Sequence, residues 1–133
     1  MATTAVEVVS PAKVLYEGDA EMVVCRTVGG EIAFLANHIP YLGALEPCVV
    51  RLVAEDGGQV RIAVGGGFVE VRDNKVVLLA DAAELGDEID VEAARAAARD
   101  AEQRLRDHAD DEEAATALRA AEARLEAAGA RGD

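Results

Sequence analysis

The sequence predicts a β plus α protein. We expect an antiparallel β-sandwich or flattened barrel of about nine to ten short strands, followed by an antiparallel two-helix hairpin. Up to residue 85, apolar residues recur at every second position, as in strands with one buried face. Beyond residue 90 they recur at steps of three and four, as in helices packed along a seam. The change of period divides the chain into a β-sandwich domain over 1–86 and a helical hairpin domain over 87–133.

Short strands are expected throughout the first part, because turn residues interrupt it often and no helix-length connection separates the segments. The clearest is Gln59–Val64, in which Val60, Ile62 and Val64 alternate with polar residues. Glu17-Gly18-Asp19 reads as a turn, and Asp73-Asn74 reads as a tight hairpin turn. The expected strands are 6–9, 12–16, 21–26, 31–35, 41–45, 49–54, 59–64, 68–72 and 75–80.

The second part predicts two helices. The first begins with Asp87 or Asp90 as its cap and runs to about Asp107, and the second runs from the acidic segment 111–113 to about Ala128. Alanine dominates the predicted seam, so the helices approach closely but bury little apolar area, which predicts a weakly docked hairpin able to rearrange. The seam residues are Val91, Ala94, Ala98, Ala101 and Leu105 on the first helix, and Ala114, Leu118, Ala121, Leu125 and Ala128 on the second.

Composition excludes several classes of protein. The net charge is −13 and the chain holds only four aromatic residues, which argues against nucleic-acid binding. Apolar runs such as 76–80 are far shorter than the roughly 18–20 residues that cross a bilayer, so no direct membrane insertion is expected. The first residues lack a charged segment and an apolar segment, so no secretory signal is visible. These features predict a cytoplasmic protein.

No catalytic, metal or cofactor site is predicted from the residues. Gly65-Gly66-Gly67 leads into a strand, whereas a phosphate-binding loop needs a helix, so we expect a turn or bulge with close backbone packing. Cys25 and Cys48 lie in apolar, strand-like segments and are expected to be reduced packing residues. His38 is expected in an exposed loop without further metal ligands nearby. A cysteine–histidine nucleophilic pair lacks any activating context.

A basic stripe stands out on the first helix of this acidic chain. Arg95, Arg99 and Arg106 share one helix face. They can pair within the helix, where Glu92, Glu102 and Asp107 are at hand, or they can dock onto an acidic partner. The residues leave both interpretations open.

Several ordered motifs resemble the ε subunit of F-type ATP synthases. That family typically shows Gly-Glu-Leu-Gly-Ile-Leu-Pro-Gly-His-Ala-Pro-Leu-Leu where this chain has Glu31-Ile32-Ala33-Phe34-Leu35-Ala36-Asn37-His38-Ile39-Pro40-Tyr41-Leu42. The match continues through the segments 66–71, 74–76, 79–81, 83–84 and 88–91. It covers the whole chain in order, including the sandwich-then-hairpin layout.

The resemblance implies a non-catalytic rotor subunit of a proton- or sodium-translocating ATP synthase, without a cofactor. Its β-sandwich would bind the γ subunit and rest on the c-ring, at the cytoplasmic face of the cell membrane. Asn37 replaces a usual glycine, and asparagine is the residue that best accepts a left-handed backbone after glycine. By position, the surface facing the c-ring would comprise Glu31, Asn37, His38, Ile39, Pro40 and Tyr41.

The resemblance also implies a regulatory hairpin. In bacterial members it lies folded on the sandwich or extends along γ towards the catalytic α/β subunits, where its basic residues restrain ATP hydrolysis. Here Arg95, Arg99, Arg104 and Arg106 would supply them.

Some members bind ATP through the motif Ile-Asp-x-x-Arg-Ala-x-x-Ala-x-x-Arg-Ala-x-x-Arg-Leu. Ile89 and Asp90 fit it, but Ala93 and Asp100 replace two arginines. This predicts little or no ATP binding at millimolar concentration.

Two other hypotheses remain. One is a stand-alone β-sandwich adaptor whose hairpin binds a partner helix. The other is a small thiol- or histidine-dependent enzyme, for which no constellation of residues is present.

Overall fold

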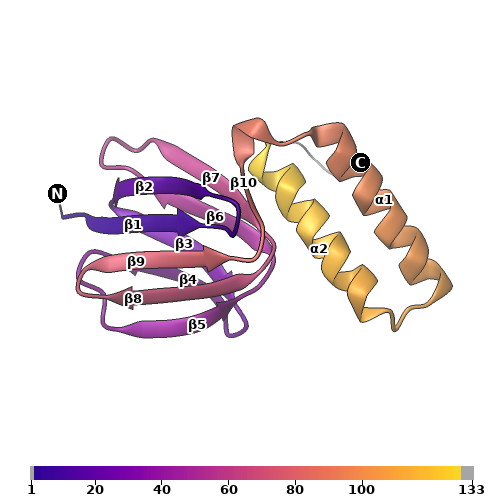
Figure 1. Cartoon of the computed structure of the whole chain (residues 1–133), viewed down its shortest axis with the longest axis horizontal. Helices are drawn as coiled ribbons and strands as arrows, with labels where there is room; N and C mark the ends of the chain where they lie inside the picture. The colour runs from indigo at the N-terminus through magenta and orange to yellow at the C-terminus, as the bar shows by residue number, and fades with distance from the viewer. Residues whose placement is uncertain (1, 130–133) are drawn as a thin grey trace.

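The computed structural model describes residues 2–129 and contains ten strands, one short 3₁₀ helix and two α-helices (Figure 1). This confirms the predicted fold class. The strands are β1 (Thr4–Val9), β2 (Val14–Ala20), β3 (Met22–Thr27), β4 (Gly30–Leu35), β5 (Tyr41–Leu45), β6 (Cys48–Val53), β7 (Gln59–Val64), β8 (Gly67–Arg72), β9 (Lys75–Ala80) and β10 (Ala83–Leu85). The helices are η1 (Gly86–Glu88), α1 (Val91–Asp107) and α2 (Glu112–Ala127).

The strands form a single sheet that folds over into two layers. Its order is β10-β7-β6-β3-β5-β8-β9-β1-β2, with β4 paired to β3. Every pairing is antiparallel except that between β1 and β9, which run parallel with Val6 opposite Val76. The two ends of the order, β10 and β2, come into contact, so the sheet is nearly closed.

Alternating side chains build the core between the two layers. On β6, Val50 and Leu52 are buried, and Val50 lies opposite the buried Ile62 of β7. Phe34 of β4 is fully buried in this core, and the partly buried Tyr16 and Tyr41 pack against it. The period-two pattern therefore predicted the inward face correctly at the central strands.

The helices begin at aspartates, as expected. Asp90 accepts a hydrogen bond from the Ala93 amide at 3.0 Å, and Asp111 accepts one from the Ala114 amide at 3.0 Å. Asp87, the other candidate for the first cap, lies in η1. These caps satisfy amides that have no partner within the helix.

Helix α2 lies between α1 and the sandwich (Figure 1). Four alanines of the predicted seam are fully buried between the two helices: Ala94, Ala101, Ala114 and Ala121. On its other side α2 buries Ala127 in a small cluster with Ala63 of β7 and Ile89. Helix α2 is thus apolar on two faces, whereas α1 buries only one.

Two details of the strand prediction were wrong. Glu17-Gly18-Asp19 is not a turn, because β2 continues to Ala20 and Gly18 pairs with Val6 of β1. Strand β10 was not predicted, because its three residues show no period and are held by pairing with β7. In both places a neighbouring strand overrides the local preference.

Candidate interaction surfaces

The turn 36–40 joins β4 to β5 and is anchored to a second turn. Asn37 has φ of 61°, so it adopts the left-handed backbone expected of it. Its amide donates a hydrogen bond to the Asn74 side-chain oxygen at 2.7 Å. Asn74 belongs to the β8–β9 turn, which lies at the end of the sandwich remote from the helices (Figure 1).

Aromatic contacts hold the same turn from inside. The His38 ring meets Phe34 edge-on with 4.9 Å between centroids, and Tyr41 lies 5.5 Å from Phe34. The Nδ1 atom of His38 is 2.7 Å from the Ile39 carbonyl oxygen. His38 lies in the loop as expected, and these contacts leave its side chain only partly exposed. Ile39 forms the tip, with 74% of its surface exposed.

Glu31 lies apart from these residues. It is the second residue of β4, opposite Arg26 of β3, and lines a groove beneath α2. The turn 36–40 follows the far end of β4, on the order of 15–20 Å away along an extended strand. The structure thus brings Asn37, His38, Ile39, Pro40 and Tyr41 together and places Glu31 at the other end of the sandwich.

An exposed apolar face covers the outside of β5, β8 and β9. Phe68 and Leu79 lie directly opposite each other in the β8–β9 ladder, and Leu42 projects from β5 on the same side. The exposed fraction is 56% for Phe68, 54% for Leu79 and 71% for Leu42. Sequence reasoning missed this face, because it depends on three strands lying side by side and because the charged Glu70 shares the exposed side of β8 with Phe68. Such a patch marks a binding surface more often than a free one.

The basic stripe of α1 is only partly available. Arg95 pairs with Glu92 at 2.8 Å, as one interpretation expected. Arg106 donates a hydrogen bond to Gln103 at 2.8 Å. Within residues 2–129, neither Arg106 nor Arg99 makes an ion pair, and both are exposed. Arg99 and Arg106 are therefore the members of the stripe that a partner can reach.

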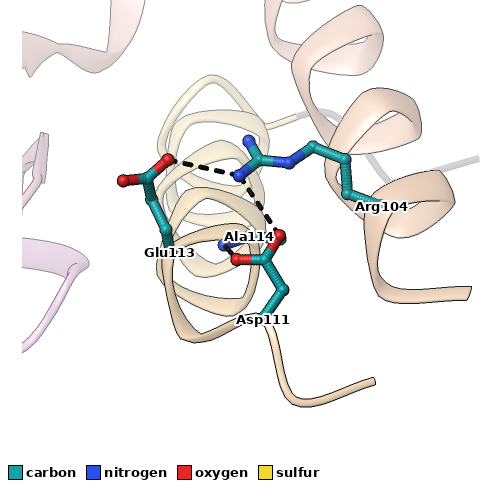
Figure 2. A network of polar contacts seen from close by, with 4 residues as sticks. All are labelled: Arg104, Asp111, Glu113 and Ala114. Carbon is teal, nitrogen blue, oxygen red and sulfur yellow. Dashed lines mark hydrogen bonds and ion pairs between the residues drawn. The ribbon is translucent and has the colours of Figure 1, made fainter. Parts of the chain in front are cut away.

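Arg104 instead joins the two helices. Figure 2 shows its guanidinium between two carboxylates of the α2 N-terminus, 3.3 Å from Asp111 and 3.2 Å from Glu113. The hydrogen bond that Arg104 donates to Glu113 and the negative charge of Asp111 raise the pKa of Arg104. The pKa of Asp111 is lowered, mainly by the hydrogen bond that it accepts from the Ala114 amide and to a lesser extent by the positive charge of Arg104. These contacts fasten the α1–α2 connection and occupy Arg104 within the hairpin.

The two residues of the nucleotide motif have structural partners. Ile89 is buried against Ala63 and Ala127, at the junction of sheet and hairpin. Asp90 caps α1 through its side chain. Both side chains therefore position the start of the hairpin.

Two contacts at this junction were not found from the sequence. Glu84 of β10 accepts a hydrogen bond from Nε of Arg124 in α2 at 2.6 Å. Gly86 packs so closely on α2 that a Cβ atom there would overlap the Ala127 carbonyl oxygen. The residues in each contact lie 40 or more positions apart in the chain, so no local sequence pattern predicts these contacts.

The remaining candidates are two cysteines and a run of glycines. Cys25 and Cys48 are buried free thiols, and burial raises the pKa of Cys25 to about 12. Gly66 and Gly67 have positive φ, and a Cβ on Gly67 would overlap the Leu79 carbonyl oxygen, so the segment is a close-packed turn as predicted. In the described chain, no three metal-binding side chains cluster, and no helix has the length and apolar character to cross a bilayer.

Comparison with known protein families gives one consistent match. Residues 3–86 match the model described as "ATP synthase, Delta/Epsilon chain, beta-sandwich domain". The ATP synthase epsilon chain of Brevibacillus brevis is 49% identical over 105 residues, which cover 79% of this chain and 80% of that one. The epsilon chain of Shouchella clausii is 45% identical over 133 residues and covers 99% of each chain.

Solved structures agree in fold. A chain in a cryo-EM structure of the Euglena gracilis mitochondrial ATP synthase superposes with a TM-score of 0.80 at 26% identity, covering 96% of this chain and 82% of that one. A chain from the central stalk and c-ring of the Tetrahymena thermophila enzyme gives 0.50 at 18% identity, covering 77% and 90%. The second likeness concerns the fold alone.

Proposed function

The chain belongs to the ATP synthase epsilon-chain family, and from this premise we propose that it is a non-catalytic subunit of the central stalk. In this role it couples rotation of the γ subunit to the c-ring. The observation that carries the proposal is the similarity to a bacterial epsilon chain along the whole length of both chains.

The γ subunit binds the apolar face of Leu42, Phe68 and Leu79. These side chains are well exposed, stand together on one side of the sheet and offer an area that association would remove from water. Burial of one such side chain contributes on the order of 2 kcal/mol.

Co-purification with γ tests this surface. We expect Phe68→Asp to reduce recovery of γ by at least about tenfold, because a charge replaces a buried apolar contact. Leu35→Asp is the matched control, since Leu35 is 56% exposed and lies on β4, which pairs with β3 and not with β5, β8 or β9. Equal loss of γ with both variants, or with neither, contradicts the assignment. Failure of the wild-type chain to recover γ favours the stand-alone adaptor.

The c-ring binds the end of the sandwich formed by the turn 36–40. Its exposed tip, Ile39, projects from a backbone fixed by the Asn37–Asn74 hydrogen bond and by the ring of His38. Glu31 lies at the opposite end and serves as the internal comparison. We expect Ile39→Asp to reduce cross-linking to the c-ring and coupled ATP synthesis, while Glu31→Gln leaves both unchanged. The reverse result would place the c-ring at the Glu31 end.

The hairpin restrains ATP hydrolysis when it leaves the sandwich. A small apolar cluster around Ala127 and the Glu84–Arg124 pair hold the hairpin on the sandwich. Because these contacts are few, the free-energy cost of undocking the hairpin is small enough for it to leave. Arg99 and Arg106, which have no ion pair within residues 2–129, meet an acidic surface of the catalytic subunits.

Truncation before Asp87 tests the restraint directly. We expect assembly to be retained and ATP hydrolysis to rise. The paired substitution of Arg99 and Arg106 by glutamine should raise hydrolysis as well, whereas Lys13→Gln, at an exposed cation between β1 and β2, should not. Unchanged hydrolysis in the truncated complex would show that the hairpin does not inhibit.

Nucleotide does not hold this hairpin closed. Two arginines of the motif are absent, and Asp90 is occupied as a helix cap. Isothermal titration of the chain with millimolar ATP should give no saturable heat. Micromolar affinity would contradict this expectation.

The complex places the chain at the cytoplasmic face of the membrane as a peripheral component. We expect it to sediment with membranes that carry the ATP synthase and to be released without detergent. Its retention until the bilayer is dissolved would contradict peripheral attachment.

A further inference from the structure

The side chain of Asn74 joins three parts of the chain at the end of the sandwich that carries the turn 36–40. Its Oδ1 atom accepts a hydrogen bond from the Asn37 amide at 2.7 Å, and its Nδ2 atom donates one to the Thr3 carbonyl oxygen at 3.0 Å. These partners lie 37 and 71 positions away in the chain. One side chain of the β8–β9 turn therefore fastens the turn 36–40 to the N-terminal segment, residues 3–5.

The backbone of Asn74 is held separately from its side chain. Its carbonyl oxygen accepts the Ala5 amide at 3.2 Å and the hydroxyl of the buried Thr4 at 2.9 Å. The β8–β9 connection consists of Asp73 and Asn74, and both adopt positive φ, of 52° and 56°. Two successive residues with positive φ are typical of a type I′ hairpin turn. Asn74 therefore presents its side chain from a well-fixed support.

The turn 36–40 has no second attachment of this kind. Throughout the described part of the chain, residues 2–129, its other hydrogen bonds stay within the turn or return to Leu35 at the end of β4. Asn37 also keeps a φ of 61°, a backbone that residues other than glycine adopt uncommonly. The bond from Asn74 favours this backbone, and it thereby limits the positions open to the exposed tip, Ile39.

We propose that Asn74 is the positioning residue of the surface that binds the c-ring, and that it makes the N-terminal segment part of the support for that surface. This inference rests on the proposed contact between the turn 36–40 and the c-ring. A turn that is already held in its bound shape loses less conformational entropy on association, so it binds more tightly than the same turn left free. Asn74 acts through the Asn37 amide and not through a contact of its own.

Substitution by glycine removes this side chain and spares the turn that carries it. Glycine adopts positive φ without strain and is preferred in type I′ turns, and the carbonyl oxygen at position 74 keeps its bonds. We expect Asn74→Gly to reduce cross-linking to the c-ring in the assembled complex by about three- to tenfold, the effect of one hydrogen bond. Asp73→Gly is the matched control, because Asp73 has the same backbone but does not bond to the turn 36–40.

Hydrogen exchange of the isolated chain separates positioning from general stability. In Asn74→Gly, exchange of the Asn37 amide should quicken by about three- to tenfold, while amides of the β6–β7 ladder exchange as in the wild type. Asn74→Asp should restore both the slow exchange and the cross-linking, because a carboxylate oxygen also accepts the Asn37 amide. Equal quickening along β6 and β7 would show that the substitution loosens the whole sandwich, and it would overturn the proposal.

The c-ring measurement also distinguishes this inference from the function on which it rests. If Ile39→Asp lowers cross-linking and Asn74→Gly does not, the turn still binds the c-ring but Asn74 does not position it. If Asp73→Gly lowers cross-linking as much as Asn74→Gly, the hairpin turn as a whole matters and the role of the Asn74 side chain is overturned. If neither Ile39→Asp nor Asn74→Gly has an effect, the proposed c-ring contact itself is wrong.

Discussion

Glu84 and Arg124 join the sheet to the hairpin through a hydrogen-bonded ion pair of 2.6 Å, across 40 residues of sequence. Glu84 belongs to the last strand before the helices, and Arg124 lies near the end of α2. The pair must break whenever the hairpin leaves the sandwich. It therefore contributes to the docked state without fixing it, since partly exposed pairs are worth about 0.2–1 kcal/mol.

Glu84→Gln should raise the population of the undocked hairpin by about two- to fivefold, which corresponds to about 0.5–1 kcal/mol. Limited proteolysis at the residues after η1 measures this population. Glu88→Gln is the control, because Glu88 is an exposed residue of η1 and makes no ion pair within residues 2–129. Equal proteolysis of the two variants would show that the pair does not hold the hairpin.

Gly86→Ala should undock the hairpin more strongly than loss of the ion pair does. The added methyl group would overlap the Ala127 carbonyl oxygen and lie 3.1 Å from that of Arg61, and both are backbone atoms that cannot swing away. Overpacking of this kind costs about 1–3 kcal/mol. Hydrogen exchange of α2 should quicken accordingly. Gly29→Ala meets only ordinary contact at 3.6 Å and should leave exchange unchanged.

Asp111 should make the hairpin sensitive to acid. The Ala114 amide and Arg104 lower its pKa below the ordinary value of 3.8 in the folded chain. A depressed folded pKa contributes stability that is present above the unfolded pKa and is lost as the pH falls through the folded one. Thermal unfolding between pH 5 and pH 2, in steps of about half a unit, should show this loss. Asp111→Asn should flatten the slope there, whereas Asp110→Asn should not.

The two thiols should be unreactive in the native chain. Burial is the main cause that raises the pKa of Cys25 to about 12, and the nearby Cys48 and Glu31 contribute less. Burial also raises the pKa of Cys48. A thiol reagent at pH 8 should label neither residue in minutes and both after denaturation. The raised pKa also predicts that stability falls as the pH rises above 9, because only the unfolded thiol then ionises. Rapid native labelling would contradict the buried assignment.

Local signals predicted most of the fold. Asp90 and Asp111 were recognisable as helix caps because the amides they satisfy lie three residues away. The change of period marked where strands give way to helices. Both of these features depend on neighbours in the sequence. The left-handed backbone of Asn37 was expected from the family resemblance instead, because Asn37 replaces a usual glycine and asparagine accepts that backbone.

Long-range pairings could not be predicted in this way. The three residues of β10 owe their conformation to β7, and β2 extends through Gly18 because β1 pairs with it. Arg51 lies opposite Arg61 because of the register between β6 and β7, and this register cannot be read from the amino-acid sequence. The contact of Gly86 with α2 likewise exists only in three dimensions.

The parallel pairing of β1 with β9 sets the order in which the chain is able to fold during its synthesis. Val6 pairs with Val76, so β1 cannot pair with β9 until the roughly 70 residues that separate them have left the ribosome. Contacts so far apart in sequence slow folding. The α1–α2 hairpin, by contrast, is built from adjacent residues and forms on a shorter timescale. Both helices follow β9 in the chain, so the β1–β9 pairing is able to close the sandwich before the surface of α2 arrives to dock on it.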